Sequence, residues 1–272
     1  MKQCVNCLKN TKSVGPVYID FLDSIYKELE GIRPDFSKYK DIDEAILSQI
    51  NNSESIIYRY VESVLLASRY KNIDALENIY GYFGNLYKLC NIPEGFSGSY
   101  YESHFDGYRF IIYEMFVSLI AALIKYENWH IIGNILSNDI FVEQKESKYI
   151  SYSRINMSVQ SLDIGRNNRL HLERASIAAD LYKNRFTQGN LSQLISHRRF
   201  LEADYFLFMR SICNDKDKLG IWCPRSCVYL NYVPRFIVRA ESRTYLENLV
   251  KAAGLDDIKE FAEKFRENNH LI

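Results

Sequence analysis

Residues 56–79, IIYRYVESVLLASRYKNIDALENI, and residues 112–135, IYEMFVSLIAALIKYENWHIIGNI, share one pattern of apolar and polar side chains. When the first stretch is shifted by 56 positions, Val61 falls on Val117 and the central YKN falls on YEN. Each apolar stripe has the spacing of an amphipathic helix, and a single helix pair cannot bury such a stripe alone. The pattern therefore predicts two stacked units, each of two antiparallel helices.

Helical spacing recurs along most of the remaining chain, but it fades between residues 143 and 168, where 149–157 could form one arm of a small hairpin. The sequence predicts an all-α fold in which an N-terminal array of antiparallel helical hairpins (16–142) follows a polar arm (1–15). An irregular connector (143–168) then leads to a C-terminal helical bundle (169–272) packed on the array. Helices are predicted at 17–30, 43–50 with Asp43 as its cap, 53–70, 74–92, 110–125, 129–136, 170–181, 190–197, 200–213, 244–253 and 256–266.

The overall composition is that of a globular protein, with 47% hydrophobic and 25% charged residues among 272. Basic and acidic residues balance at 34 each, which argues against attraction of the whole protein to nucleic acid or to an anionic membrane. The longest apolar run, 110–124, is interrupted by Glu114 and is too short to cross a bilayer. No secretory signal pattern opens the sequence. We therefore expect a cytoplasmic protein without a membrane partner, and the abundance of Tyr, Ile, Asn and Lys suggests a bacterial genome.

Charge is distributed unevenly along the chain. Residues 19–127 contain seventeen acidic and ten basic side chains, whereas residues 148–199 contain nine basic and three acidic ones. The basic segment could be a solvated helical surface or could dock onto the acidic N-terminal half. Alternatively, it could face phosphates.

The basic segment contains the sequence RNNRLH, residues 166–171. This sequence resembles the RNxxxH motif of HEPN-superfamily ribonucleases. The resemblance implies that Arg166, Asn167 and His171 gather at the mouth of a helical bundle, usually across a homodimer interface. It further implies RNA cleavage through the ribose 2′-hydroxyl without a metal ion.

The chemistry of these residue types is compatible with that activity. An imidazole titrates near neutral pH and can transfer the proton, while a guanidinium presents a planar fork to the scissile phosphate. Asn167 would orient one of these groups. The alternative is a surface histidine among solvated arginines. In the ribonuclease hypothesis, RNA would be bound by Arg154, Arg169, Arg174, Arg198 and Arg199.

Six cysteines are present, and in a cytoplasmic protein we expect reduced thiols. Cys4 and Cys7 form a CxxC pair, and Cys223 and Cys227 form a CxxxC pair. Four thiolates brought together could hold a tetrahedral zinc ion. Apart from this zinc hypothesis, the sequence indicates no cofactor.

The C-terminal half, from His171 through the run LEADYFLFMR (201–210) to Phe236, is similar to uncharacterised helical regions of bacterial antiphage proteins. That similarity implies a defence role. Paired helices provide extended contact surface without catalytic residues. The leading hypothesis is therefore a protein-interaction or sensor module of a bacterial defence or regulatory complex, with the HEPN-like endoribonuclease as the alternative. A small-molecule enzyme is a third class, with no supporting motif.

Overall fold

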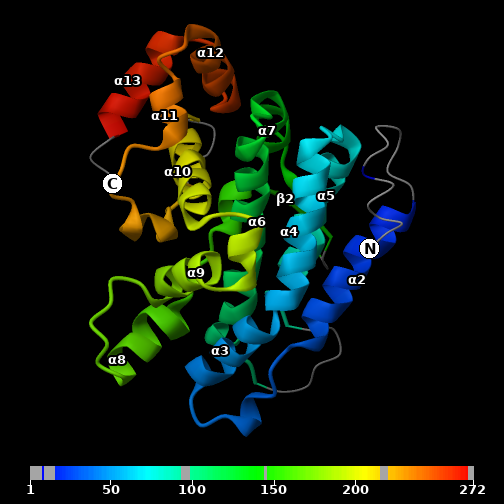
Figure 1. Ribbon diagram of the computed structural model, residues 1–272. Coiled ribbons are helices and arrows are strands. Elements are labelled where there is room, and N and C mark those ends of the chain that lie inside the picture. Colours follow the sequence, from blue (N-terminus) through cyan, green and yellow to red (C-terminus); the bar gives the residue numbers. More distant parts are fainter. Residues whose placement is uncertain (1–7, 9–15, 93–98, 144–145, 215–219, 269–272) are drawn as a thin grey trace.

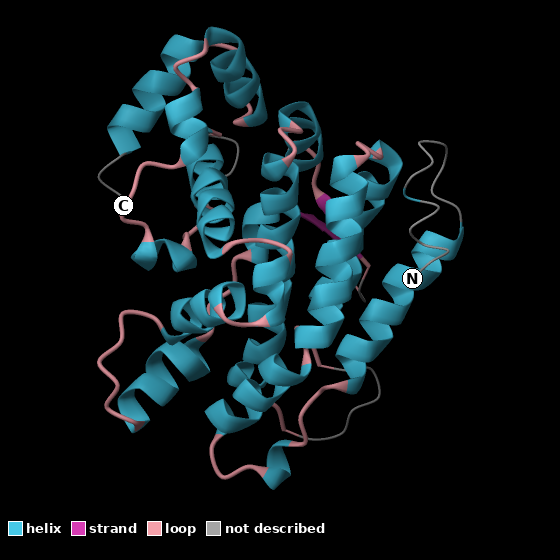
Figure 2. Ribbon diagram, viewed as in Figure 1, coloured by secondary structure: helices cyan, strands magenta, loops and turns pink. Residues whose placement is uncertain are grey.

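The computed structural model describes Leu8 and residues 16–92, 99–143, 146–214 and 220–268. Helices form nearly all the regular structure of these residues, as Figure 2 shows. The all-α fold predicted from the sequence is therefore confirmed.

The described residues form one β-hairpin. Strand β1 (Ile140–Val142) pairs antiparallel with β2 (Lys148–Ile150). The strand expected over 149–157 is present but ends at Ile150, because the chain then enters the 3₁₀ helix η3 (Tyr152–Ile155).

The N-terminal half is an array of antiparallel helices that lie side by side in Figure 1. Its helices are α2 (Pro16–Gly31), α3 (Ile42–Asn52), α4 (Glu54–Arg69), α5 (Ile73–Lys88), α6 (Asp106–Lys125) and α7 (Trp129–Leu136). Helices α2, α4 and α5 pack together, and α4 also packs along α6, which is the central helix of the protein.

The internal similarity of the sequence appears as two turns of the same geometry, one joining α4 to α5 and one joining α6 to α7. Lys71 and Glu127 both adopt left-handed backbone conformations, with φ of 51° and 57°. The next residues, Asn72 and Asn128, each donate a backbone N–H to the carbonyl five residues earlier, at 3.0 Å. This is the Schellman helix ending. The Asn128 side chain also donates to the Ser68 carbonyl at 2.7 Å, which joins the two units.

The central helix α6 is buried on all sides, which explains its unbroken apolar character. Residues Glu102–Lys125 are long and apolar enough to span a membrane by length and composition, but 94% of their 18-residue apolar stretch is buried inside the protein. The apolar surface of α6 is thus covered by its own neighbours.

One charged residue of α6, Glu114, is neutralised by an arginine of α9 (Ile177–Thr187). Arg185 donates to the two Glu114 carboxylate oxygens at 2.7 and 2.9 Å, and both side chains are buried. The same guanidinium donates to the Ile50 carbonyl of α3 at 3.1 Å. This group therefore connects three helices and leaves no unpaired charge.

The C-terminal half continues the same hydrophobic core, since one cluster of buried side chains runs through both halves of the described chain. Helix α10 (His197–Cys213) packs along α6, and helix α12 (Arg243–Ala252) packs against α7. Between the halves, the connector contains β2, η3 and the π-helical turn η4 (Ser161–Arg166). The later helices are α8 (Asn167–Arg169), α9 (Ile177–Thr187), α10 (His197–Cys213), α11 (Arg235–Arg239), α12 (Arg243–Ala252) and α13 (Ile258–Asn268).

Two predicted helices of the C-terminal half were wrong. The helix expected over 170–181 begins only at Ile177, because the Ser176 side chain caps it there. The helix expected over 190–197 is only a 3₁₀ turn, η5 (Asn190–Gln193).

Candidate functional site

Arg166, the first residue of the motif, ends the π-helical turn η4. Its guanidinium donates to the Asp43 carboxylate of α3 at 2.9 Å. Arg169 donates to both oxygens of the same carboxylate, at 3.1 and 2.7 Å. Two arginines of the basic segment therefore fasten η4 and α8 to the acidic start of α3, as the docking alternative expects.

Asp43 does not cap α3 as predicted, because the helix begins one residue earlier, at Ile42, with Asp41 in the cap position. Burial alone would raise the pKa of Asp43, but the hydrogen bonds from Arg169 and Arg166 outweigh it and hold the pKa below its usual range. The Asp43 carboxylate thus stabilises the tertiary structure by holding Arg166 and Arg169 against α3.

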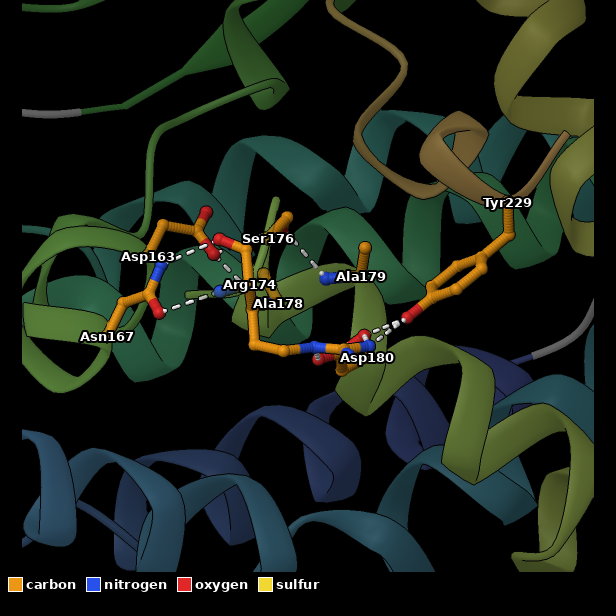
Figure 3. Close-up of polar contacts among 8 residues, drawn as sticks. All are labelled: Asp163, Asn167, Arg174, Ser176, Ala178, Ala179, Asp180 and Tyr229. Carbon is orange, nitrogen blue, oxygen red and sulfur yellow. Dashed lines mark hydrogen bonds and ion pairs between the residues drawn. The ribbon is translucent and has the colours of Figure 1, made fainter. Parts of the chain in front are cut away.

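Asn167, the second motif residue, closes a loop (Figure 3). Its side-chain amide donates to the Arg174 carbonyl at 2.7 Å and accepts from the Arg174 N–H at 3.0 Å. The Arg174 guanidinium in turn binds Asp180 at 2.7 and 2.9 Å and donates to the Tyr229 hydroxyl at 3.0 Å. Both Asn167 and the predicted RNA-binding Arg174 therefore make intramolecular contacts.

His171 lies at the end of a helix and not at the helix start expected from the sequence. Its φ is 50°, and the N–H of the following residue bonds back to Asn167 at 3.0 Å, which completes another Schellman ending. His171 is exposed and lines a hollow of about 360 Å³ together with Asn167, Asn168 and Glu173. The structure thus brings two motif residues to one hollow, while Arg166 bonds to α3.

The remaining arginines predicted to bind RNA differ in their surroundings. Arg198 and Arg199 each lie 3.4 Å from the buried Glu202 carboxylate. Arg154 is exposed, and no carboxylate among the described residues pairs with it. It lines the cavity of about 820 Å³ described below.

Half of the predicted zinc site, Cys4 and Cys7, lies outside the described residues. Cys223 is exposed as a whole residue, but partial burial of its thiol raises its pKa. The described residues contain no group of three or more metal-binding side chains. The zinc site stays a prediction.

A cavity of about 820 Å³ lies where β2 and η3 meet the ends of α5, α7 and α10. A pocket of this size can enclose a drug-sized ligand. We call it the Arg210 cavity, after a buried arginine that lies behind its wall. Its lining includes Tyr87, Ser137, Lys148, Tyr149, Arg154 and Ser211.

Behind the wall of this cavity lies Arg210 of α10, whose relative exposure is 0%. One guanidinium nitrogen donates to the Ser137 hydroxyl at 3.0 Å and another donates to the Ala252 carbonyl. Its Nε has no hydrogen-bond partner, and no carboxylate of the described residues pairs with the guanidinium. Burial lowers the pKa of Arg210, and the nearby Tyr152 opposes that change.

A glycine gives Arg210 the space to occupy this position. Gly254, which lines the cavity, ends α12 with φ of 84°. A β-carbon at Gly254 would lie 3.3 Å from a terminal nitrogen of Arg210, tighter than ordinary contact. The turn therefore favours glycine for its backbone conformation and for the close approach of the guanidinium.

The cavity wall is continuous with a buried polar network. Ser211 on the wall accepts a hydrogen bond from the Trp222 N–H at 3.0 Å. The Trp222 indole donates to the Asp204 carboxylate at 2.7 Å, and Asp204 also accepts from Tyr113 and from the N–H and hydroxyl of Ser226. A change at the wall therefore has a direct route of contacts into the core.

Of this site, sequence reasoning found only Arg154. Arg210 carried one signal, a charged residue at the end of the apolar run YFLFM (205–209). The sequence does not distinguish Arg210 from an arginine that pairs with a carboxylate, because its actual partners Ser137 and Ala252 are 73 and 42 positions away.

Comparison with protein-family models, with curated protein sequences and with solved structures yields no match to this chain. The residues and their arrangement therefore carry the functional argument.

Proposed function

We propose that this chain is a helical sensor module that binds a small anionic ligand in the Arg210 cavity and signals to a protein partner in a bacterial defence or regulatory complex. The observation that carries the proposal is the buried guanidinium of Arg210, which has neutral partners where a carboxylate would be expected. Burying an unpaired charge costs several kcal/mol. A bound anion would offset part of that cost.

The charges around the cavity favour the same ligand class. Lys148 and Arg154 line it, and Arg210 lies behind its wall, whereas Asp139 is the one acidic residue among the described residues of the lining. At an effective dielectric constant of about 20, an anion that approached a guanidinium to about 6 Å would gain about 3 kcal/mol. The two exposed cations add less, because solvent screens them.

The sensor part of the proposal rests on the contacts of the wall. Tyr152 stacks on Trp222 with ring centroids 6.2 Å apart, and Ser211 bonds the Trp222 backbone. An occupant that moves either wall residue changes the surroundings of Trp222. The surface segment that follows Trp222 is held through Asp204 and Ser226 and would move with it.

The test is isothermal titration of the full chain with phosphate, pyrophosphate, AMP and citrate at low ionic strength. We expect at least one anion to bind, with an affinity that falls roughly tenfold in Arg154→Gln. The control is Arg243→Gln, which removes an arginine whose side chain is 88% exposed and lies outside the lining. Absence of binding by folded protein, or equal losses in the two variants, would overturn the proposal.

A second candidate, metal-independent RNA cleavage, is favoured by the hollow that Asn167 and His171 share. If it is correct, His171→Ala abolishes cleavage of single-stranded RNA while leaving the melting temperature unchanged, because the side chain is exposed. Asn168→Ala, which changes another residue of the same hollow, should retain cleavage. Wild-type protein that leaves RNA intact at concentrations that force dimerisation would exclude this candidate.

A further inference from the structure

We infer that the ligand of the Arg210 cavity is a phosphorylated compound that carries an aromatic ring, of the size of a nucleoside monophosphate. This inference rests on the proposed function and adds the chemical class of the ligand. The volume of about 820 Å³ exceeds what a bare phosphate needs and falls within the range of pockets for drug-sized ligands.

The aromatic part of the inference comes from Tyr149. This side chain is 71% exposed, the highest value among the exposed large hydrophobic residues of the described chain, yet it lines the cavity. Its ring lies across the hairpin from Phe141, with centroids 5.2 Å apart. A planar ligand ring stacked on Tyr149 would cover this surface, and such stacking contributes about 1–3 kcal/mol per base in nucleic-acid complexes.

A second tyrosine and the adjacent cation support the same ligand. Tyr87 of α5 is half-buried in the lining, and the Lys148 ammonium lies 5.7 Å from its ring centroid. Lys148 and Tyr149 are neighbours on β2, so their side chains leave opposite faces of the strand, although both residues line the cavity.

Polar groups for the sugar are also present in the lining. Asp139 is exposed and has no ion-pair partner among the described residues, and an acidic side chain is a common acceptor for ribose hydroxyls. Asn214, at the end of α10, adds an amide that can both donate and accept. The lining therefore offers a complementary group for each part of a nucleotide: phosphate, sugar and base.

The experiment compares four classes of probe by titration of the full chain: the 5′-monophosphates AMP, GMP, CMP and UMP; ribose 5-phosphate; the four matching nucleosides; and inorganic phosphate. We expect at least one monophosphate to bind tenfold or more tightly than ribose 5-phosphate and than its own nucleoside. Tyr149→Leu should lower the affinity for that monophosphate to the affinity for ribose 5-phosphate, while Tyr149→Phe should keep the wild-type affinity. Tyr101→Leu is the matched control, since Tyr101 is 66% exposed and lies outside the lining.

The outcomes separate the two proposals. Ribose 5-phosphate that binds as tightly as every monophosphate would overturn the aromatic inference and leave anion binding intact. Nucleosides that bind as tightly as their monophosphates would overturn the anionic ligand itself. If no probe binds, the inferred ligand class is wrong, and citrate or pyrophosphate binding in the earlier titration then decides whether anion binding stands.

Discussion

Replacement of Arg210 by methionine should weaken anion binding strongly and change stability little. Methionine retains much of the aliphatic volume of arginine and removes the charge. If the anion approaches Arg210 to about 6 Å, loss of that interaction corresponds to about 3 kcal/mol at an effective dielectric constant of about 20. We therefore expect the dissociation constant of the tightest anion to rise about 100-fold.

The effect on stability follows from two opposing contributions. The substitution leaves the Ala252 carbonyl without its charged donor, which costs about 1–3 kcal/mol. It also removes a buried cation that has no carboxylate partner, and this desolvation penalty is several kcal/mol. The free energy of unfolding should therefore stay within about 2 kcal/mol of wild type.

Arg185→Met is the matched control, because Arg185 is the other buried arginine of the described chain. Its removal leaves the Glu114 carboxylate buried and unpaired, so we expect a loss of about 3–5 kcal/mol. Urea denaturation followed by circular dichroism gives both unfolding free energies, and titration of the folded Arg210→Met protein gives the affinity. A stability loss in Arg210→Met as large as in Arg185→Met, with unchanged anion affinity, would refute the reasoning.

Three further predictions concern the framework of the fold. The lowered pKa of Asp43 means that the folded state binds fewer protons at this carboxyl than the unfolded chain, whose ordinary value is 3.8. Its contribution to stability is therefore present above the ordinary value of 3.8 and is lost as pH falls below it, through the lowered pKa of the folded state. Acid unfolding of Asp43→Asn, measured by circular dichroism, should lack this part of the pH dependence. Lys71→Gly and Glu127→Gly should each raise the unfolding free energy in urea by about 1 kcal/mol, because glycine adopts the left-handed conformation without strain, and a decrease would contradict the turn assignment. Asp204→Ala should lower the melting temperature more than any of these changes, because it leaves the Trp222 indole and other buried donors unsatisfied.

Regular periodicity made much of the fold predictable. The helix Trp129–Leu136 has the predicted bounds, and the long helices α2, α4, α6 and α10 lie where apolar residues recur at helical spacing. The predictions failed where tertiary contacts override local pattern. Asp43 has the residue type and position of a helix cap, but two arginines more than 120 positions away bind it.

The RNNRLH stretch illustrates a different limit. Its residue types suit catalysis, but the sequence does not indicate which side chains are already bonded within the fold. The Asn167 side-chain amide uses both its nitrogen and its oxygen to hydrogen-bond the Arg174 backbone, and the Arg166 guanidinium bonds to Asp43. Only the folded chain distinguishes a guanidinium that fastens two helices from one that faces a ligand.

That distinction also explains why a chain without net charge can present a local anion site. Within residues 148–199, acids of the described chain pair with each arginine except Arg154. Among the described residues Arg210 lacks such a partner as well, and it lies behind the wall of the cavity that Arg154 and Lys148 line. The position of Arg154 and Lys148 beside a buried guanidinium favours a site that a ligand completes. The salt dependence of binding would measure how much of the attraction these two exposed cations provide.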